Sequence, residues 1–294
     1  MERQYDTDLA LEAAESFSAE DDINTLPGVL IEDITDGGCQ RHCVTITDPE
    51  SGKKLGKAPG KYVTLEPEAL LERQPEALGA AARELAEALG LLLPPLGPES
   101  TVLVVGLGNE MITPDALGPL TMRSIFVTRH LRRRLPEHFG DFRPVAALET
   151  GVLSTTGMET VETLSAVCGL LHPDLVIAVD ALACGGVSRL CSTVQLTDTG
   201  ISPGGGVGNR QTALNQEALG APVIAVGVPT VISARHLVQE AAEDLSCPPA
   251  LQALIVTPRD IDEKVQTFAK LLGYGISLAL QPGLSLEDLE LFLS

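Results

Sequence analysis

Short apolar runs alternate with longer amphipathic segments from residue 102 onward. The runs occupy residues 102–105, 145–148, 175–179, 193–196, 223–226 and 254–256. Their length and their β-branched side chains are typical of buried strands. Helical patterns separate most of them, near residues 160–171, 231–245 and 261–280. This order predicts an α/β fold with a mostly parallel sheet that helices cover on both faces.

The first hundred residues follow a different pattern. Residues 28–34, 42–47 and 62–65 predict short strands separated by tight turns, which indicates a small antiparallel layer over about residues 27–66. A helix is expected over residues 68–92. Residues 1–20 are polar and acidic, and we expect a mobile arm. Residues 21–294 are then predicted to form one α/β domain.

The charge balance is strongly acidic, with 40 Asp and Glu against 20 Lys and Arg and a net charge of −20. Nucleic acids bind clustered Lys and Arg, so we expect no direct nucleic-acid partner. The basic run at residues 129–134 is interpreted as a solvated helix face, with an acidic partner as the alternative. No export signal or membrane span is visible, which predicts a cytoplasmic protein that does not bind a membrane.

The six cysteines do not have the spacing of a disulfide framework, and we interpret them as reduced thiols. Cys39, His42 and Cys43 resemble half of a zinc site, but no second pair of ligands follows. Gly106 and Gly108 resemble part of a dinucleotide-binding motif, but the third glycine is missing. The sequence therefore predicts no metal and no cofactor at these motifs.

Two acids follow buried strands. Asp115 lies in the loop after residues 102–105, and Asp180 directly follows residues 175–179. Ligands of open α/β sheets bind beyond the carboxyl ends of the strands. Two acids that meet there repel each other, so one can donate a proton while the other activates water. The alternative is that each acid only caps its own loop through backbone N–H groups.

Two glycine-containing loops are candidates for the wall of such a pocket. The first loop offers Gly106 and Asn109, and the second, at residues 201–210, offers Gly205 and Asn209. Glycine allows the backbone of such a loop to approach a ligand and to present N–H groups to a carbonyl oxygen. A plain flexible loop is the alternative for residues 201–210.

Several segments resemble the germination protease family of spore-forming bacteria. They are, in order, VVGLGNEMITPDALGP, GVLSTTGMET, VDALA, SPGGGVGN and PVIAVGVPTV, with YDTDLA near the amino end and VTP near the carboxyl end. The resemblance covers nearly the whole chain. It implies an endopeptidase, made as a self-processing zymogen, that degrades small acid-soluble spore proteins during germination. It also implies a fold related to that of the hydrogenase maturation endopeptidases.

The resemblance assigns roles to four residues. The family's two catalytic aspartates correspond to Asp115 in TPDALGP and Asp180 in VDALA. The family's processing site corresponds to the bond between Thr7 and Asp8, so residues 1–7 would be the propeptide. The resemblance further implies self-association and a place in the cytoplasm of the forespore or spore core. Which aspartate is acid and which is base stays open.

Two alternatives to this interpretation remain. One is a metal-dependent endopeptidase of the maturation type, for which Asn209 stands where a histidine ligand would be needed, so we expect no metal. The other is a catalytically inactive binding homologue. The chain also departs from the family pattern at Thr150 and Ser154, and its carboxyl half is shorter than is typical.

Overall fold

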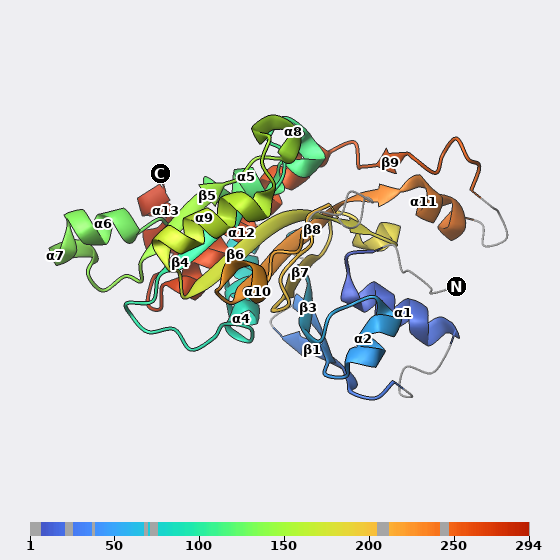
Figure 1. Cartoon of the computed structure of the whole chain (residues 1–294), viewed down its shortest axis with the longest axis horizontal. Helices are drawn as coiled ribbons and strands as arrows, with labels where there is room; N and C mark the ends of the chain where they lie inside the picture. Colours follow the sequence, from blue (N-terminus) through green and yellow to red (C-terminus); the bar gives the residue numbers. More distant parts are fainter. Residues whose placement is uncertain are drawn as a thin grey trace.

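The computed structural model describes residues 7–20, 26–36, 39–67, 70, 76–204, 212–241 and 247–293. These residues form a nine-stranded sheet in the order β1-β2-β3-β7-β8-β6-β4-β5, with β9 paired to β8 (Figure 1). The strands are β1 Val29–Asp36, β2 Cys39–Ile46, β3 Gly60–Glu66, β4 Val102–Gly106, β5 Val145–Glu149, β6 Leu175–Cys184, β7 Val194–Thr197, β8 Val223–Ser233 and β9 Ile255–Val256.

The centre of the sheet is parallel and its other pairs are antiparallel. Strands β5, β4, β6 and β8 run in one direction, which confirms the predicted α/β class. Strands β1 to β3 are antiparallel, as predicted, but they do not form a separate layer. Strand β3 pairs with β7, which is itself antiparallel to β8, so the N-terminal strands extend the main sheet. The free edge of β7 makes this extension possible.

Helices cover both faces of the sheet. They are α1 Ala10–Glu20, α2 Pro49–Leu55, α4 Ala77–Gly90, α5 Leu117–Met122, α6 Arg129–Arg134, α7 Pro136–Phe139, α8 Leu153–Thr156, α9 Thr160–Leu171, α10 Gln216–Leu219, α11 Ala234–Ala241, α12 Ile261–Leu280 and α13 Leu286–Leu293. Figure 1 shows α9 and α10 in front of the central strands and α12 behind them. None of the described helices combines the length and the apolar character needed to cross a bilayer.

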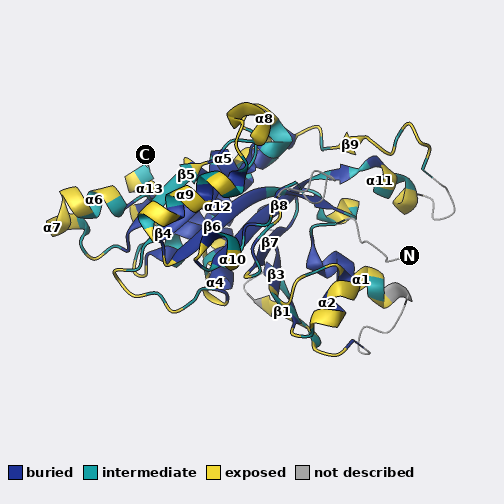
Figure 2. Cartoon of the chain, in the orientation of Figure 1, coloured by how far each residue is buried: buried dark blue, intermediate teal, exposed yellow. Residues whose placement is uncertain are grey.

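Alternate side chains of the central strands enter two separate cores. Val102 and Val104 of β4 pack in the core that contains α12, whereas Leu103 and Val105 pack in the core that contains α9. A strand that is covered on both faces requires this continuous apolar run, because successive side chains point in opposite directions. The central strands are accordingly the most buried part of the molecule (Figure 2).

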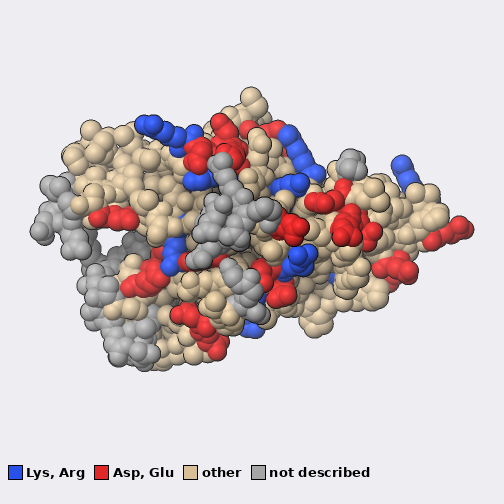
Figure 3. All heavy atoms as spheres, turned by 180° about the vertical axis from the view of Figure 1, so that it is seen from behind, with Lys and Arg blue, Asp and Glu red and all other residues tan. Residues whose placement is uncertain are grey.

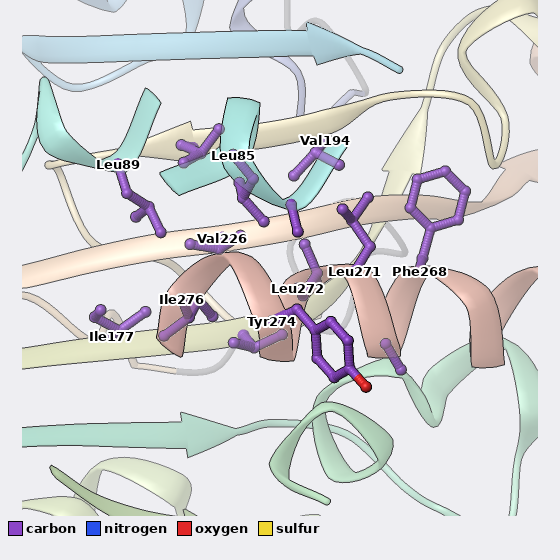
Figure 4. Packing of buried hydrophobic residues seen from close by; sticks show 14 of the residues in the cluster. Leu85, Leu89, Ile177, Val194, Val226, Phe268, Leu271, Leu272, Tyr274 and Ile276 are labelled. Carbon is purple, nitrogen blue, oxygen red and sulfur yellow. The ribbon is translucent and has the colours of Figure 1, made fainter. Parts of the chain in front are cut away.

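The larger core is built around α12. Leu272 of this helix lies close to Leu85 of α4, and Phe268, further along α12, belongs to the same core (Figure 4). A Cβ atom at Gly275 would lie 2.5 Å from the Leu85 side chain, so glycine lets α12 and α4 pack closely. Burying a side chain such as Leu272 stabilises the fold by roughly 1.5–3 kcal/mol.

The amino-terminal helix is packed rather than extended into solvent. Leu9 and Ala13 are fully buried, and Leu11 joins a core with Ile46 of β2 and Leu55 of α2. Residues 9–14 of the segment predicted as a mobile arm are therefore part of the folded protein. The sequence shows that these side chains are apolar, but it does not show which surface of the protein buries them.

Charged side chains of both signs are spread over the surface. On the face shown in Figure 3, Lys and Arg are interspersed with Asp and Glu. Within the predicted basic run, now helix α6, Arg132 pairs with Glu99 at 2.7 Å. No residue of α6 is buried, as expected for a solvated helix face.

Candidate active site

A cavity of about 460 Å³ lies beyond the carboxyl end of β4 and alongside residues 180–183 of β6. Three acids line it, and they are Asp8, Asp115 and Asp180. Much of the remaining wall is apolar and includes Leu107, Ile112, Pro114, Val152, Leu182 and Val231. The cavity therefore combines a small group of carboxyl groups with a surface that excludes water, which is typical of a catalytic or binding pocket.

Asp115 is held in the cavity wall by a tight turn. It ends the short 3₁₀ helix η2, Thr113–Asp115. The N–H group of Asn109 donates to Asp115 Oδ2 at 2.9 Å. Gly108 has a φ of +104°, and a Cβ atom there would lie 2.2 Å from Asp115 O. Only glycine fits this position without strain, because other residues rarely adopt such a φ.

Two glycines bring the loop with Asp115 close to the middle of β6. Gly106 closes β4, and a Cβ atom on it would lie 2.5 Å from Gly118 O at the start of α5. A Cβ atom on Gly118 would lie 2.2 Å from Leu107 O and 2.7 Å from Val179 O. The backbone of α5 therefore packs directly against Leu107, which follows β4, and against Val179 in the middle of β6. This contact places the loop that carries Asp115 beside Asp180.

Asp180 is the most enclosed acid of the site, with 5% of its surface exposed. The Ala181 N–H group donates to Asp180 Oδ1 at 2.9 Å. Burial raises the pKa of Asp180 well above its usual value, and the carboxyl groups of Asp115 and Asp8 raise it further. Asp180 thus holds its proton to a higher pH than an exposed aspartate does.

Asp115 has a different environment although it shares the cavity. It is half-buried, and burial raises its pKa, while the hydrogen bond from Asn109 N–H acts in the opposite direction. The two acids are therefore unequal, with Asp180 favoured as the protonated partner. Each acid also accepts a backbone N–H group from its own loop or strand. The two acids therefore make the local hydrogen bonds of the alternative interpretation and also share one cavity.

Asp180 should make the stability of the protein depend on pH. The folded state keeps the Asp180 proton at pH values where the unfolded chain has released it, so the free energy of unfolding falls as pH rises through this window. Asn cannot ionise, and Asp180→Asn should therefore raise Tm more at pH 8.5 than at pH 5.5, by about 2–4 °C for each kcal/mol. Thermal unfolding of both proteins checks this, and an equal difference in Tm at the two pH values would contradict it.

Of the four residues predicted to line the pocket, the structure describes Gly106 and Asn109. Gly106 packs against Gly118, and the backbone N–H group of Asn109 donates to the carboxylate of Asp115. Gly205 and Asn209 lie outside the described residues. Pro203 and Gly204, from the same loop, line the cavity.

The predicted processing site lies beside the cavity. Asp8 N–H donates to Ala183 O at 3.0 Å, and Ala183 N–H donates to Asp8 Oδ2 at 2.8 Å. Ala183 belongs to β6, three residues after Asp180. Strand β4 pairs with β6 only as far as Val179, so Asp8 binds the strand edge that β4 leaves open.

Two charged residues at this site are absent from the sequence predictions. Lys57 Nζ donates to Thr7 O at 2.9 Å and to Asp8 O at 2.8 Å. Burial lowers the pKa of Lys57 to about 8, against the effect of the nearby carboxyl groups of Asp8 and Glu12. Glu12 accepts the N–H groups of Gly185 at 2.7 Å and Gly186 at 3.0 Å. No local motif marks Lys57 or Glu12, because their partners are distant in the sequence.

The three acids of the cavity do not form a ready metal site. In the described part of the chain, no three His, Cys, Asp or Glu side chains are placed to hold an ion together. Asp8, Asp115 and Asp180 each use a carboxylate oxygen to accept a backbone N–H. His42, from the motif that resembles half a zinc site, contacts Asp33 Oδ1 at 2.7 Å.

Comparison with known proteins gives a consistent result. The family model described as germination protease matches residues 6–246. The germination protease of Caldanaerobacter subterraneus subsp. tengcongensis is 41% identical over an alignment of 317 positions, which covers 97% of this chain and 96% of that protein. The germination protease of Clostridium tetani is 36% identical, covering 98% and 99%. That of Bacillus cereus is 37% identical, covering 96% and 76%.

Proposed function

The chain belongs to the germination protease family, a family of peptidases, and we propose that it is an endopeptidase in which Asp115 and Asp180 hydrolyse the peptide bond. One observation carries this proposal. Two carboxyl groups, from the loop after β4 and from β6, face one cavity in unequal environments. Paired acids of this kind can divide general-base and general-acid catalysis between them.

The environments of the two acids suggest their roles. Ionised Asp115 takes a proton from a water molecule, and the hydroxide attacks the carbonyl carbon of the substrate. Asp180 polarises the carbonyl oxygen and gives its proton to the nitrogen of the leaving amine as the C–N bond breaks. Asp115 then holds one proton and Asp180 has lost one, so a proton transfer between them or with solvent restores the starting state. The higher pKa of Asp180 supports this assignment.

The full-length chain is, in this proposal, a zymogen that cuts its own Thr7–Asp8 bond. Asp8 lines the same cavity as the two catalytic acids, which supports processing within one chain. Lys57 holds the carbonyl groups on both sides of the cut, those of Thr7 and Asp8. The bond is therefore presented in a defined position.

The substrates are proposed to be small acid-soluble spore proteins, degraded during germination. The family of the relatives supports a protease of germination. We propose that the enzyme acts in the cytoplasm of the forespore or spore core. We further propose that the protein self-associates and that it binds neither membranes nor nucleic acid directly. The interspersed surface charges are in accord with the last point (Figure 3).

Mass spectrometry of a digest tests this function. Purified protein is incubated with a small acid-soluble spore protein, and both the substrate fragments and the amino terminus of the enzyme are measured. We expect defined fragments and a new terminus at Asp8. Failure to cut the spore protein under conditions where the enzyme is folded would favour the inactive-homologue alternative.

Removal of divalent ions separates the proposed mechanism from a metal-dependent one. Three acids line the cavity, although among the described residues they are not grouped to hold an ion, and this experiment tests whether an ion takes part. We expect the rate of peptide cleavage to be unchanged, within about twofold, after exhaustive chelation, because Asp115 and Asp180 supply both proton transfers. A loss of activity that added Zn²⁺ or Mn²⁺ restores would show that an ion takes part.

A further inference from the structure

The contacts that Asp8 makes with Ala183 and Lys57 involve no residue that precedes it, although Leu9 N–H also donates to Thr7 Oγ1 at 3.2 Å. The backbone and side chain of Asp8 bind Ala183, and its carbonyl oxygen binds Lys57 Nζ at 2.8 Å. The following residue, Leu9, is fully buried in a cluster with Cys184 and Ile232. These contacts remain when residues 1–7 leave, so the first residue of the processed chain stays at the cavity wall.

Cleavage of the Thr7–Asp8 bond creates a new charge at this fixed position. Water adds its hydroxyl to the Thr7 carbonyl carbon, and the Asp8 nitrogen gains a proton to become an amine. An α-amino group has an ordinary pKa of about 7.7–8.0, so it is positively charged at neutral pH. Before cleavage, the same nitrogen is an uncharged amide that donates to Ala183 O.

We propose that the amino terminus formed at Asp8 is a working part of the mature active site, in which the α-ammonium and the carboxylate of Asp8 set the charge beside Asp180. This inference rests on the proposed function, because it takes the processing site to be Thr7–Asp8. Self-processing then does more than remove a propeptide. It changes the cavity wall from one negative charge at Asp8 to a neutral pair of charges.

The charged groups that face the new terminus each favour or disfavour the charged form of its amine. The carboxylate of Asp8 and that of Glu12, from α1, favour the charged amine, while Lys57, from the loop after α2, disfavours it. Cleavage also removes the Thr7 hydroxyl from Glu12 and the Thr7 carbonyl from Lys57. The ammonium offsets the effect of the Asp8 carboxylate on Asp180, so the pKa of Asp180 falls on processing.

The pH dependence of the processed enzyme tests the inference. The self-processed protein is compared with the same protein acetylated at its α-amino group, using a synthetic peptide of residues 1–14 as substrate. Cleavage requires protonated Asp180, so activity is lost as pH rises through its pKa. Acetylation removes the positive charge, and the alkaline limb of kcat/KM should move to higher pH by about one unit.

Two variants support the same measurement without chemical modification. In a chain with one extra glycine before Asp8, the ammonium lies further from Ala183. The alkaline limb of kcat/KM should then move to higher pH, as it does on acetylation. Asp8→Asn with a free amino terminus should move the alkaline limb of kcat/KM to lower pH, because a negative charge beside Asp180 is lost. Superimposable pH profiles for the free and acetylated proteins, with acetylation shown to be complete by mass, would overturn the inference. Normal cleavage by Asp115→Asn or Asp180→Asn would instead overturn the proposed function on which it rests.

Discussion

Replacing Asp180 by Asn should lower the rate of peptide cleavage by about a thousandfold or more, and Asp115→Asn should have an effect of similar size. The amide introduced by Asp180→Asn can still accept the Ala181 N–H, but it has no carboxyl proton to donate to the leaving amine. General acid and general base catalysis each contribute roughly 10²–10⁴-fold, so the loss of either partner is large. Initial rates on the peptide of residues 1–14 and the extent of self-processing measure this loss.

A surface acid provides the matched control for both variants. Asp141 is exposed and lies outside the cavity, so Asp141→Asn should process itself and cut the peptide at the normal rate. All three variants replace one carboxyl group by an amide of nearly the same size, so the control matches the steric change. Near-normal cleavage by either cavity variant, with the control also active, would remove the paired-acid mechanism. The double variant should be no slower than the slower single one if the two acids act as a unit.

The positions of the two acids could be predicted because each depends on local sequence. Asp180 follows an apolar run that only a buried strand explains, and Asp115 follows another after a glycine turn. The expectation that Asp180 ends its strand is wrong, because β6 continues to Cys184, and the loop after β4 comes beside Asp180 because β4 ends at Gly106, level with Val179. The unequal burial of the two acids could not be predicted, since it depends on the loops and helices that close the cavity.

Other features depend on contacts between distant parts of the chain. The edge of β7 that receives β3 exists only once β7 has paired antiparallel with β8. Lys57 and Glu12 likewise depend on the folded structure. Lys57 contacts Asp8 and Glu12 contacts Gly185 only once α1 and α2 have packed against the sheet. In the sequence, Lys57 lies in an ordinary turn and Glu12 in an ordinary acidic helix. Residues of this kind are found from the folded structure, because no spacing or motif distinguishes them.

Gly118→Ala should destabilise the protein by about 3 kcal/mol or more and lower Tm by on the order of 10 °C. Its Cβ atom would lie 2.2 Å from Leu107 O, 2.5 Å from Leu107 N and 2.7 Å from Val179 O. All three are backbone atoms, of the residue that follows β4 and of the middle of β6, so no side chain can turn away to make room. Alanine favours a helix over glycine by only about 1 kcal/mol, which does not offset this overlap.

Gly169→Ala in α9 is the control, because we expect it to stabilise the protein rather than destabilise it. No atom lies within 4 Å of a Cβ atom added there, so Gly169→Ala should raise the free energy of unfolding by up to about 1 kcal/mol. Chemical denaturation of both variants measures the difference, and the peptide of residues 1–14 measures activity. Because α5 must move to admit the methyl group added by Gly118→Ala, the loop with Asp115 shifts away from Asp180, and cleavage should fall even at temperatures where the protein is folded. Equal stability and activity in the two variants would show that the contact of α5 with Leu107 and Val179 does not position the acid pair.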